Sequence, residues 1–125
     1  AMLQALRRLT KRAGATWRRV RAGHEIEMDG VTLVVRHPPV ESWQRVRVRN
    51  DDSLVVEVRY GRVSILLTGD AGPEFERAEW AGPRAGRPAA IRVLKVGHHG
   101  SRTSSSPALL ARYPPHLAVI SAGAG

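Results

Sequence analysis

The sequence of 125 residues contains no cysteine, few acidic residues and no long apolar run. Without cysteine, neither a disulfide framework nor a thiolate metal site can form, although this absence does not decide the compartment. No apolar run approaches the ~18 residues that a membrane-spanning helix needs. No internal repeat or low-complexity tract is present. The length suits one domain with a real core, since a chain of this size buries roughly two thirds of its unfolded surface.

Acidic residues are outnumbered, because 20 Lys and Arg face 11 Asp and Glu and give a formal net charge of +9. Such a balance favours a polyanionic partner, either nucleic acid or an anionic membrane surface. The same composition, rich in arginine, alanine and glycine, is also what a GC-rich coding bias produces. Charge alone therefore leaves both interpretations open.

Hydrophobic periodicity predicts an α/β fold with a mixed sheet and flanking helices. The middle of the chain is rich in strands, and strands alternate with helices towards the end. Residues 63–67 are nearly all apolar, so we expect this strand to be central. Turns are expected at residues 29–30 and 60–62, and a loop at 80–88. We expect helices in residues 2–14, 73–80 and 107–113, and strands in 16–23, 24–30, 31–39, 43–50, 53–61, 62–70, 91–97 and 116–121.

Two of the expected strands end in polar, titratable residues. One gives LLTGD, ending at Asp70, and the other gives LKVGHHGS, with His98 and His99 after a glycine. Strands of α/β folds deliver site residues at their carboxyl ends, so we expect these three side chains to converge at one edge of the sheet. Imidazole and carboxylate together suit zinc, or manganese and iron in wetter sites. The sequence therefore predicts a metal site there.

Each of these residues also has a structural interpretation. Asp70 precedes a helix that it could cap, and a histidine after a strand is usually an ordinary loop residue. The hydroxyls that follow can cap the helix that begins at Pro107, or they and the helix N-terminus can receive a phosphate. These hydroxyls belong to Ser101, Thr103, Ser104 and Ser105. As candidate substrate-binding residues we take Lys95, Ser101 and Ser104.

The remaining histidines are weaker candidates. His24 and His37 lie at expected turns, where we expect them to be exposed, and His116 lies in a Pro-Pro-His connection with an expected structural role. Ser101 and His98 are close in sequence and have no partnering acid motif, so they do not indicate a serine triad.

Three stretches carry a resemblance to a known family: NDDSLVVEVRYGRVSILLTGD, LKVGHHGSRTSSSPALL and PPHLAVIS. They resemble the metallo-β-lactamase-fold domain of ComEC-type DNA-internalisation (competence) proteins. The stretch GVTLVVRHPP matches the family's strand that ends in a His-Pro or Trp-Pro pair. The specific part is the TGD and HHGS pair in this order and at this separation, and the resemblance covers nearly the whole chain.

The resemblance implies a metal-dependent hydrolase fold, an αββα sandwich of two sheets flanked by helices. It implies that Asp70 bridges two metal ions, zinc or manganese. Both His98 and His99 match the motif, and His98 is the favoured ligand, with His99 near the substrate. The resemblance further implies attachment to a membrane channel that passes single-stranded DNA, at the extracytoplasmic face of the cytoplasmic membrane, and degradation of one DNA strand.

Two departures from the family pattern limit what this chain can do. The family's first metal motif, His-x-Asp-x-Asp-His, and its closing Gly-His-Pro motif are absent. We expect them before Met2 and after Gly125, which makes residues 1–125 an internal part of one truncated domain. Two or three remaining ligands cannot enclose two metal ions. We therefore expect no hydrolysis by this chain alone, whereas a longer parent is expected to be active.

Arginines in two stretches are candidates for sequence-independent DNA binding, which weakens as salt rises. Arg45, Arg47 and Arg49 alternate along one expected strand. Both stretches are also typical of solvated faces, and for the strand a solvated face is the favoured interpretation. The other basic residues precede the first acid, Glu25, and are Arg7, Arg8, Lys11, Arg12, Arg18, Arg19 and Arg21. Three functions stay open: a metal-dependent nuclease, an inactive DNA-binding or channel-gating module, and a hydrolase of another phosphodiester. The oligomeric state is also open.

Overall fold

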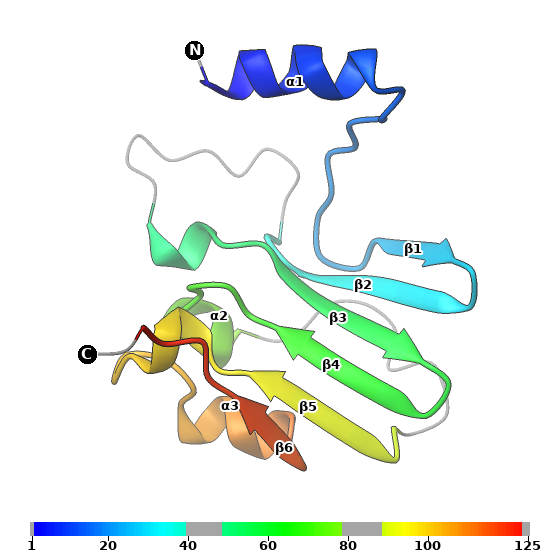
Figure 1. Ribbon diagram of the computed structural model, residues 1–125. Helices are drawn as coiled ribbons and strands as arrows, with labels where there is room; N and C mark the ends of the chain where they lie inside the picture. Colours follow the sequence, from blue (N-terminus) through cyan, green and yellow to red (C-terminus); the bar gives the residue numbers. More distant parts are fainter. Residues whose placement is uncertain (1, 40–48, 79–88, 124–125) are drawn as a thin grey trace.

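The computed structural model describes residues 2–39, 49–78 and 89–123, which form an α/β fold (Figure 1). One six-stranded sheet has the order β1-β2-β3-β4-β5-β6. Its strands are β1 Glu25–Met28, β2 Val31–His37, β3 Val55–Tyr60, β4 Val63–Leu67, β5 Ile91–Lys95 and β6 Leu117–Val119. The described α-helices are α1 Met2–Arg12, α2 Pro73–Arg77 and α3 Pro107–Arg112, with short 3₁₀ turns at Asn50–Asp52 and Gly97–Gly100. The predicted α/β class and mixed sheet are confirmed.

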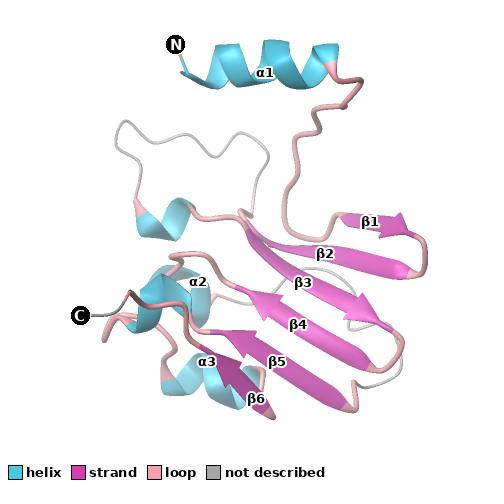
Figure 2. Cartoon of the chain, in the orientation of Figure 1, coloured by secondary structure: helices cyan, strands magenta, loops and turns pink. Residues whose placement is uncertain are grey.

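The sheet has an antiparallel half and a parallel half. β1 to β4 pair antiparallel through hairpins, and the first turn places Asp29 and Gly30 at φ of 47° and 81°. Two consecutive left-handed residues are what a two-residue hairpin turn requires, which explains the Asp-Gly pair. β4, β5 and β6 are parallel, and α3 lies between β5 and β6 in the chain (Figure 2). β4 is interior, as its apolar sequence predicts.

One face of the sheet is covered by α2 and α3. Alternate strand residues point to this face, where Val55, Leu66 and Leu94 meet Phe75 of α2 and Leu109 of α3. All five side chains are 0 or 1% exposed. Period-two alternation in the strands and the short helices after β4 and β5 therefore produce the core.

A charged network is buried on the same covered face. Glu57 of β3 accepts hydrogen bonds from Arg36, Arg59 and the Ser64 hydroxyl at 2.5–3.0 Å. Ser64 also contacts the Tyr113 hydroxyl at 2.9 Å. Burial raises the pKa of Glu57, but the bonds from Arg59, Ser64 and Arg36 outweigh it, so its pKa lies below the usual value. Burial raises the pKa of the Tyr113 phenol.

The opposite face of the sheet is apolar and only partly covered. Strand register places a continuous set of apolar residues on it: Val56, Val58, Val63, Ile65, Leu67, Ile91, Val93, Leu117 and Val119. Leu67, Ile91, Leu117 and Val119 are 38, 49, 57 and 48% exposed. This set is called the open face below. Sheets whose strands are apolar on both faces are usually covered by other elements on both faces.

Helix α1 stands apart from the sheet (Figure 1). Its contacts are with the connection that follows it, where the Trp17 indole N–H donates to the Thr10 hydroxyl and the Arg7 guanidinium lies 5.4 Å from the Trp17 ring centroid. Leu6 and Leu9 on its apolar side are 48 and 62% exposed. Within the described ranges, no helix is both long and apolar enough to cross a bilayer.

Two expected strands are not found as predicted. Residues 16–23 form no strand; they are an irregular connection that reaches β2 only at its end, where Gly23 N–H donates to the Val35 carbonyl at 2.9 Å. Most of the expected strand at 43–50 lies outside the described residues, as does the expected loop at 80–88. Arg49 is described, and it precedes the 3₁₀ turn Asn50–Asp52 instead of lying in a strand.

Candidate metal site at the edge of the sheet

The carboxyl ends of β4 and β5 lie side by side because these strands are parallel neighbours. Two bonds hold the segments after them together. The Thr68 hydroxyl donates to the Lys95 carbonyl at 3.1 Å, and His98 N–H donates to the Gly69 carbonyl at 3.0 Å. The prediction that two adjacent strands deliver the TGD and HHGS segments to one edge is confirmed.

Glycines at both strand ends permit this close approach. Gly69 has φ of 56°, and a Cβ there would lie 3.2 Å from the Ser53 Cβ. A Cβ on Gly97 would lie 3.1 Å from the Thr68 hydroxyl oxygen, which is tighter than ordinary packing allows. The backbone N–H of Asp70 donates to the Ser53 hydroxyl at 3.2 Å. The loop before β3 therefore helps to fix the direction in which Asp70 leaves its strand.

Asp70 and His99 come together at this edge. His99 Nε2 lies 3.8 Å from Asp70 Oδ1, a separation too long for a hydrogen bond. The side chains are 62% and 44% exposed, so water screens the pair and any direct ion pair contributes little. His99 Nδ1 lies 2.7 Å from the Ser121 carbonyl oxygen, which can only accept, so in the neutral ring Nδ1 carries the proton and Nε2 the lone pair. The lone pair of His99 and a carboxylate oxygen thus stand close together.

His98 and His99 occupy an unusual backbone conformation. Their φ values are 46° and 53°, both in the left-handed region that side-chain-bearing residues rarely adopt. The His98 ring lies next to Asn50, whose Nδ2 is 3.4 Å from both ring nitrogens. The structure therefore places the His99 ring, and not the ring of the favoured His98, against Asp70. Which histidine binds metal stays a prediction.

The donor set at this edge fits a divalent metal but is small. Two ligand bonds of ~2.1 Å can span the separation of His99 and Asp70, and mixed nitrogen and oxygen donors suit zinc or manganese. The Nδ1–H bond to a backbone carbonyl is the arrangement that orients metal-binding histidines. In the described part of the chain, no group of three or more His, Asp or Glu residues is placed to hold an ion.

The serine-rich loop after HHGS is held by the fold itself. The cap of α3 is Ser106, which accepts from Leu109 N–H, and none of the four hydroxyl residues expected to cap it does so. Ser104 donates to the Gly97 carbonyl at 2.8 Å, and Ser101 bonds the Thr103 hydroxyl at 3.0 Å. These candidate substrate contacts have local structural partners, and so does Lys95, whose Nζ donates to the Val96 carbonyl at 3.3 Å.

A buried carboxylate lies at the N-terminus of α3, where the sequence suggested that a phosphate could bind. Glu76 of α2 is 1% exposed and accepts from the backbone N–H groups of Ser105 and Ser106 at 2.5 and 2.7 Å. These amides lie just before α3, so an outside anion would have to displace Glu76. Nothing in the stretch PEFER distinguishes Glu76 from its exposed neighbour Glu74, so no local signal could have identified it.

Two of the other histidines, His24 and His37, are less exposed than expected. His37 is 4% exposed rather than solvent-facing, because β2 turns it against Phe75 with ring centroids 5.8 Å apart. Burial lowers the pKa of His37, although the backbone and charge of Asp51 act in the opposite direction. His24 is half-buried. The structural role of His116 is confirmed, since its Nδ1 accepts from Arg92 N–H at 3.1 Å.

The basic residues that the sequence suggests for DNA binding are exposed wherever the structure describes them. Arg49 is exposed at the start of its 3₁₀ turn, while Arg45 and Arg47 lie outside the described residues. The basic residues that precede Glu25 are all exposed: Arg7, Arg8, Lys11, Arg12, Arg18, Arg19 and Arg21. Their role in binding a polyanion stays a prediction.

Comparison with curated proteins connects the chain to competence proteins. It is 44% identical over 77 residues to Recombination protein 2 of Haemophilus influenzae, and the match covers 62% of this chain but 9% of the relative. It is 38% identical over 76 residues to ComE operon protein 3 of Bacillus subtilis, covering 60% of the chain and 9% of the relative. Competence protein ComA of Neisseria gonorrhoeae is 39% identical over 74 residues, covering 59% and 10%.

These matches make the chain homologous to a segment of ComEC-type competence proteins. It spans about a tenth of the length of these relatives. No family model matches the chain, and no solved structure matches it.

Proposed function

We propose that this chain is part of a metal-dependent hydrolase domain in a ComEC-type DNA-uptake protein, and that the domain cuts or handles single-stranded DNA. The homology to a segment of competence proteins supports the DNA-uptake setting. In this proposal the domain is attached to the membrane channel of its parent and works at the extracytoplasmic face of the cytoplasmic membrane. The fold proposed for the complete domain is the metallo-β-lactamase sandwich.

One observation carries the hydrolase part of the proposal. The lone pair on His99 Nε2 lies 3.8 Å from Asp70 Oδ1, at the adjoining ends of two parallel strands, with Nδ1–H directed at a backbone carbonyl. Such a pair can hold one side of a divalent ion, and His98 is the further candidate beside it. A bound ion would lower the pKa of a water ligand and polarise a phosphodiester. The chain's own contribution is to place these donors.

The open face supports the proposed sandwich. Its residues are apolar on three parallel strands, yet Leu117 and Ile91 are about half exposed. Residues of this kind on a parallel sheet are normally covered by a second layer. In the complete domain we propose that a second sheet lies on this face and that elements outside residues 1–125 supply the missing ligands. Four or more ligands are what two clamped metal ions need.

The decisive test compares this chain with a longer parent protein on linear single-stranded and double-stranded DNA. With added manganese or zinc, we expect cleavage by the parent and no appreciable cleavage by the chain alone, because two or three donors hold an ion too weakly to position hydroxide. Asp70→Ala in the parent should lower the cleavage rate by at least ~100-fold, since a metal ligand is removed. Glu74→Ala, an exposed carboxylate on α2, is the matched control and should keep the rate.

Two results would overturn parts of this proposal. Robust metal-dependent cleavage by residues 1–125 would remove the claim that the ligand set is incomplete. Cleavage by the parent that survives Asp70→Ala would remove the role of that carboxylate. Parallel assays with His98→Ala and His99→Ala then decide which histidine is needed. Activity on a different phosphodiester, with no action on DNA, would identify the third function that the sequence leaves open.

A second candidate is a DNA-binding module without catalysis. It is favoured by the exposed basic residues before Glu25 and by the absence, among the described residues, of a complete ligand group. Binding to labelled single-stranded DNA should be independent of base sequence and should weaken steeply between about 50 and 200 mM salt, at roughly the slopes known for phosphate contacts. A parent protein that binds DNA this way, but never cuts it with any divalent metal, would establish this alternative.

A further inference from the structure

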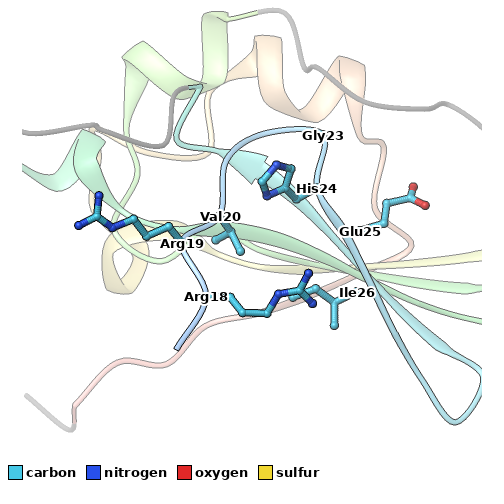
Figure 3. A pocket seen from close by; sticks show the side chains of 7 residues that line it. All are labelled: Arg18, Arg19, Val20, Gly23, His24, Glu25 and Ile26. Carbon is cyan, nitrogen blue, oxygen red and sulfur yellow. The ribbon is translucent and has the colours of Figure 1, made fainter. Parts of the chain in front are cut away.

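A pocket lies where the connection between α1 and β1 meets the start of β1. Its volume is about 310 Å³, within the range of roughly 300–1,000 Å³ typical of ligand sites. Arg18, Arg19 and His24 supply its polar lining, and Val20 and Ile26 supply apolar walls (Figure 3). These five residues are called the arginine pocket below.

The charge of the arginine pocket is not neutralised by its surroundings. Arg18 and Arg19 are exposed, and within the described ranges neither side chain makes a hydrogen bond or an ion pair. Glu25 also borders the pocket, but it directs its carboxylate away from His24 and Arg19 (Figure 3). No acidic residue occurs anywhere before Glu25. Figure 3 shows the Arg18 guanidinium beside Ile26 and the Arg19 guanidinium on the opposite side of the connection, so the two groups are suited to separate phosphates of one strand.

The register of the sheet places this pocket level with the end of β4. The carbonyl of His24 accepts from Val35 N–H at 2.9 Å, Val35 pairs with Val56, and Val56 pairs with Leu67. His24 is therefore three strand spacings across from Leu67, which is about 14 Å at the usual spacing of roughly 4.7–4.9 Å. Asp70 follows Leu67 by three residues. The two sites thus lie along the same edge of the sheet.

We propose that Arg18 and Arg19 of the arginine pocket bind separate backbone phosphates of a single-stranded nucleic acid whose chain also passes the Asp70–His99 pair. This inference rests on the proposed function and adds to it a second point of contact, which sets the path of the strand along the edge. The planar guanidinium groups contact phosphate oxygens, and the half-buried Val20 and Ile26 limit access of water to them. Contacts of this kind carry no base preference.

The test measures binding of a fluorescein-labelled oligothymidine to this chain by anisotropy at about 50 and 200 mM salt. Arg18→Ala/Arg19→Ala should weaken binding about tenfold at low salt and reduce the salt slope by about 0.7 for each phosphate that the variant no longer neutralises. The matched control is Arg62→Ala/Arg77→Ala, which removes the same charge from exposed positions in the β3–β4 turn and on α2 and should weaken binding less than about threefold. Arg18→Lys/Arg19→Lys should retain the salt slope with intermediate affinity, because charge remains without the planar fork.

The outcomes separate this inference from the function it rests on. Equal weakening by the pocket and control variants would overturn the pocket while leaving DNA binding intact. No binding of wild-type chain to DNA at low salt would overturn both the pocket and the proposed DNA partner. Loss of cleavage in a parent protein carrying Asp70→Ala, with the effect of the pocket variant on binding preserved, would support both sites as separate contributors.

Discussion

The two faces of the sheet differ in how far other elements cover them. On the covered face, Leu66 and Leu94 are 0 and 1% exposed beneath α2 and α3, and even a carboxylate, Glu57, has its hydrogen bonds satisfied. On the open face, Ile91 is 49% exposed although it lies on the same strand, β5, as the buried Leu94, and Leu117 of the neighbouring β6 is 57% exposed. The strands are therefore apolar on both sides, while the described helices α2 and α3 cover one side.

The difference between the two faces indicates which side chains contribute most to the stability of this chain by itself. Burial of apolar area contributes roughly 25 cal/mol per Å², so side chains on the covered face contribute in full and those on the open face contribute in part. If a second layer covers the open face in a longer protein, as we propose, the two faces become equivalent there. The following substitutions test that contrast.

The largest expected effect is on the covered face, at Glu57. Glu57→Ala leaves Arg36, which is 7% exposed, without its carboxylate partner. Removal of one member of a buried ion pair typically costs about 3–5 kcal/mol. We expect a loss of this size in the free energy of unfolding, measured by urea denaturation at neutral pH.

The pH dependence of this loss checks its cause. The pKa of Glu57 is lowered in the fold, so its contribution is complete above the pKa of the unfolded carboxyl and disappears as pH falls through the folded value. The difference between wild type and Glu57→Ala should therefore shrink only in acid, below about pH 4.3. A difference that is constant down to the acid transition would show that packing, and not charge, is responsible.

Next in size is a pair of neighbours on β4 that point to opposite faces. Leu66→Ala on the covered face should lower the free energy of unfolding by about 2–5 kcal/mol through lost transfer energy and a cavity. Ile65→Ala on the open face should lower it by about 1 kcal/mol, because the side chain is already partly exposed. Equal losses of unfolding free energy for the two variants in this chain would contradict the difference between the faces. In a longer parent, a rise of the Ile65→Ala loss towards that of Leu66→Ala would support the second layer.

The smallest expected effect concerns His37, which borders the covered core. Because burial lowers its pKa, the folded chain holds it neutral while the unfolded chain takes up a proton below about pH 6.5. Stability should fall as pH drops from about 6.5, by about 1.4 kcal/mol for each unit of lowered pKa. His37→Gln should remove this dependence, whereas His24→Gln should keep it. A pH profile unchanged by His37→Gln would contradict the burial of the neutral ring.

Local patterns in the sequence were sufficient for much of the fold. The Asp29-Gly30 turn, the alternation in β3 and the apolar run of β4 predict their elements because each signal acts within a few residues. The placement of the TGD and HHGS segments at one edge follows from the rule for parallel strands and is confirmed. The approach of His99 to Asp70 is a consequence of that placement.

Long-range partners were not predictable in the same way. Arg36 bonds Glu57 across 21 residues, and Glu76 bonds Ser105 and Ser106 across 29 and 30. Such pairs depend on the register and cover of the complete sheet, which no local period encodes. The strand predicted at residues 16–23 does not form for a related reason. A strand-like sequence becomes a strand only where a neighbouring strand pairs with it.

The backbone at His98 and His99 also has an evolutionary consequence. Left-handed φ at two adjacent side-chain-bearing residues costs about 1–2 kcal/mol each, which glycine or asparagine would relieve. A lineage that keeps histidine at both positions bears this cost for as long as the imidazoles are useful. In lineages that have abandoned the chemistry, drift should convert the pair to Gly or Asn before it erodes the buried residues beneath. The composition of this loop across descendants therefore records whether selection still acts on the site.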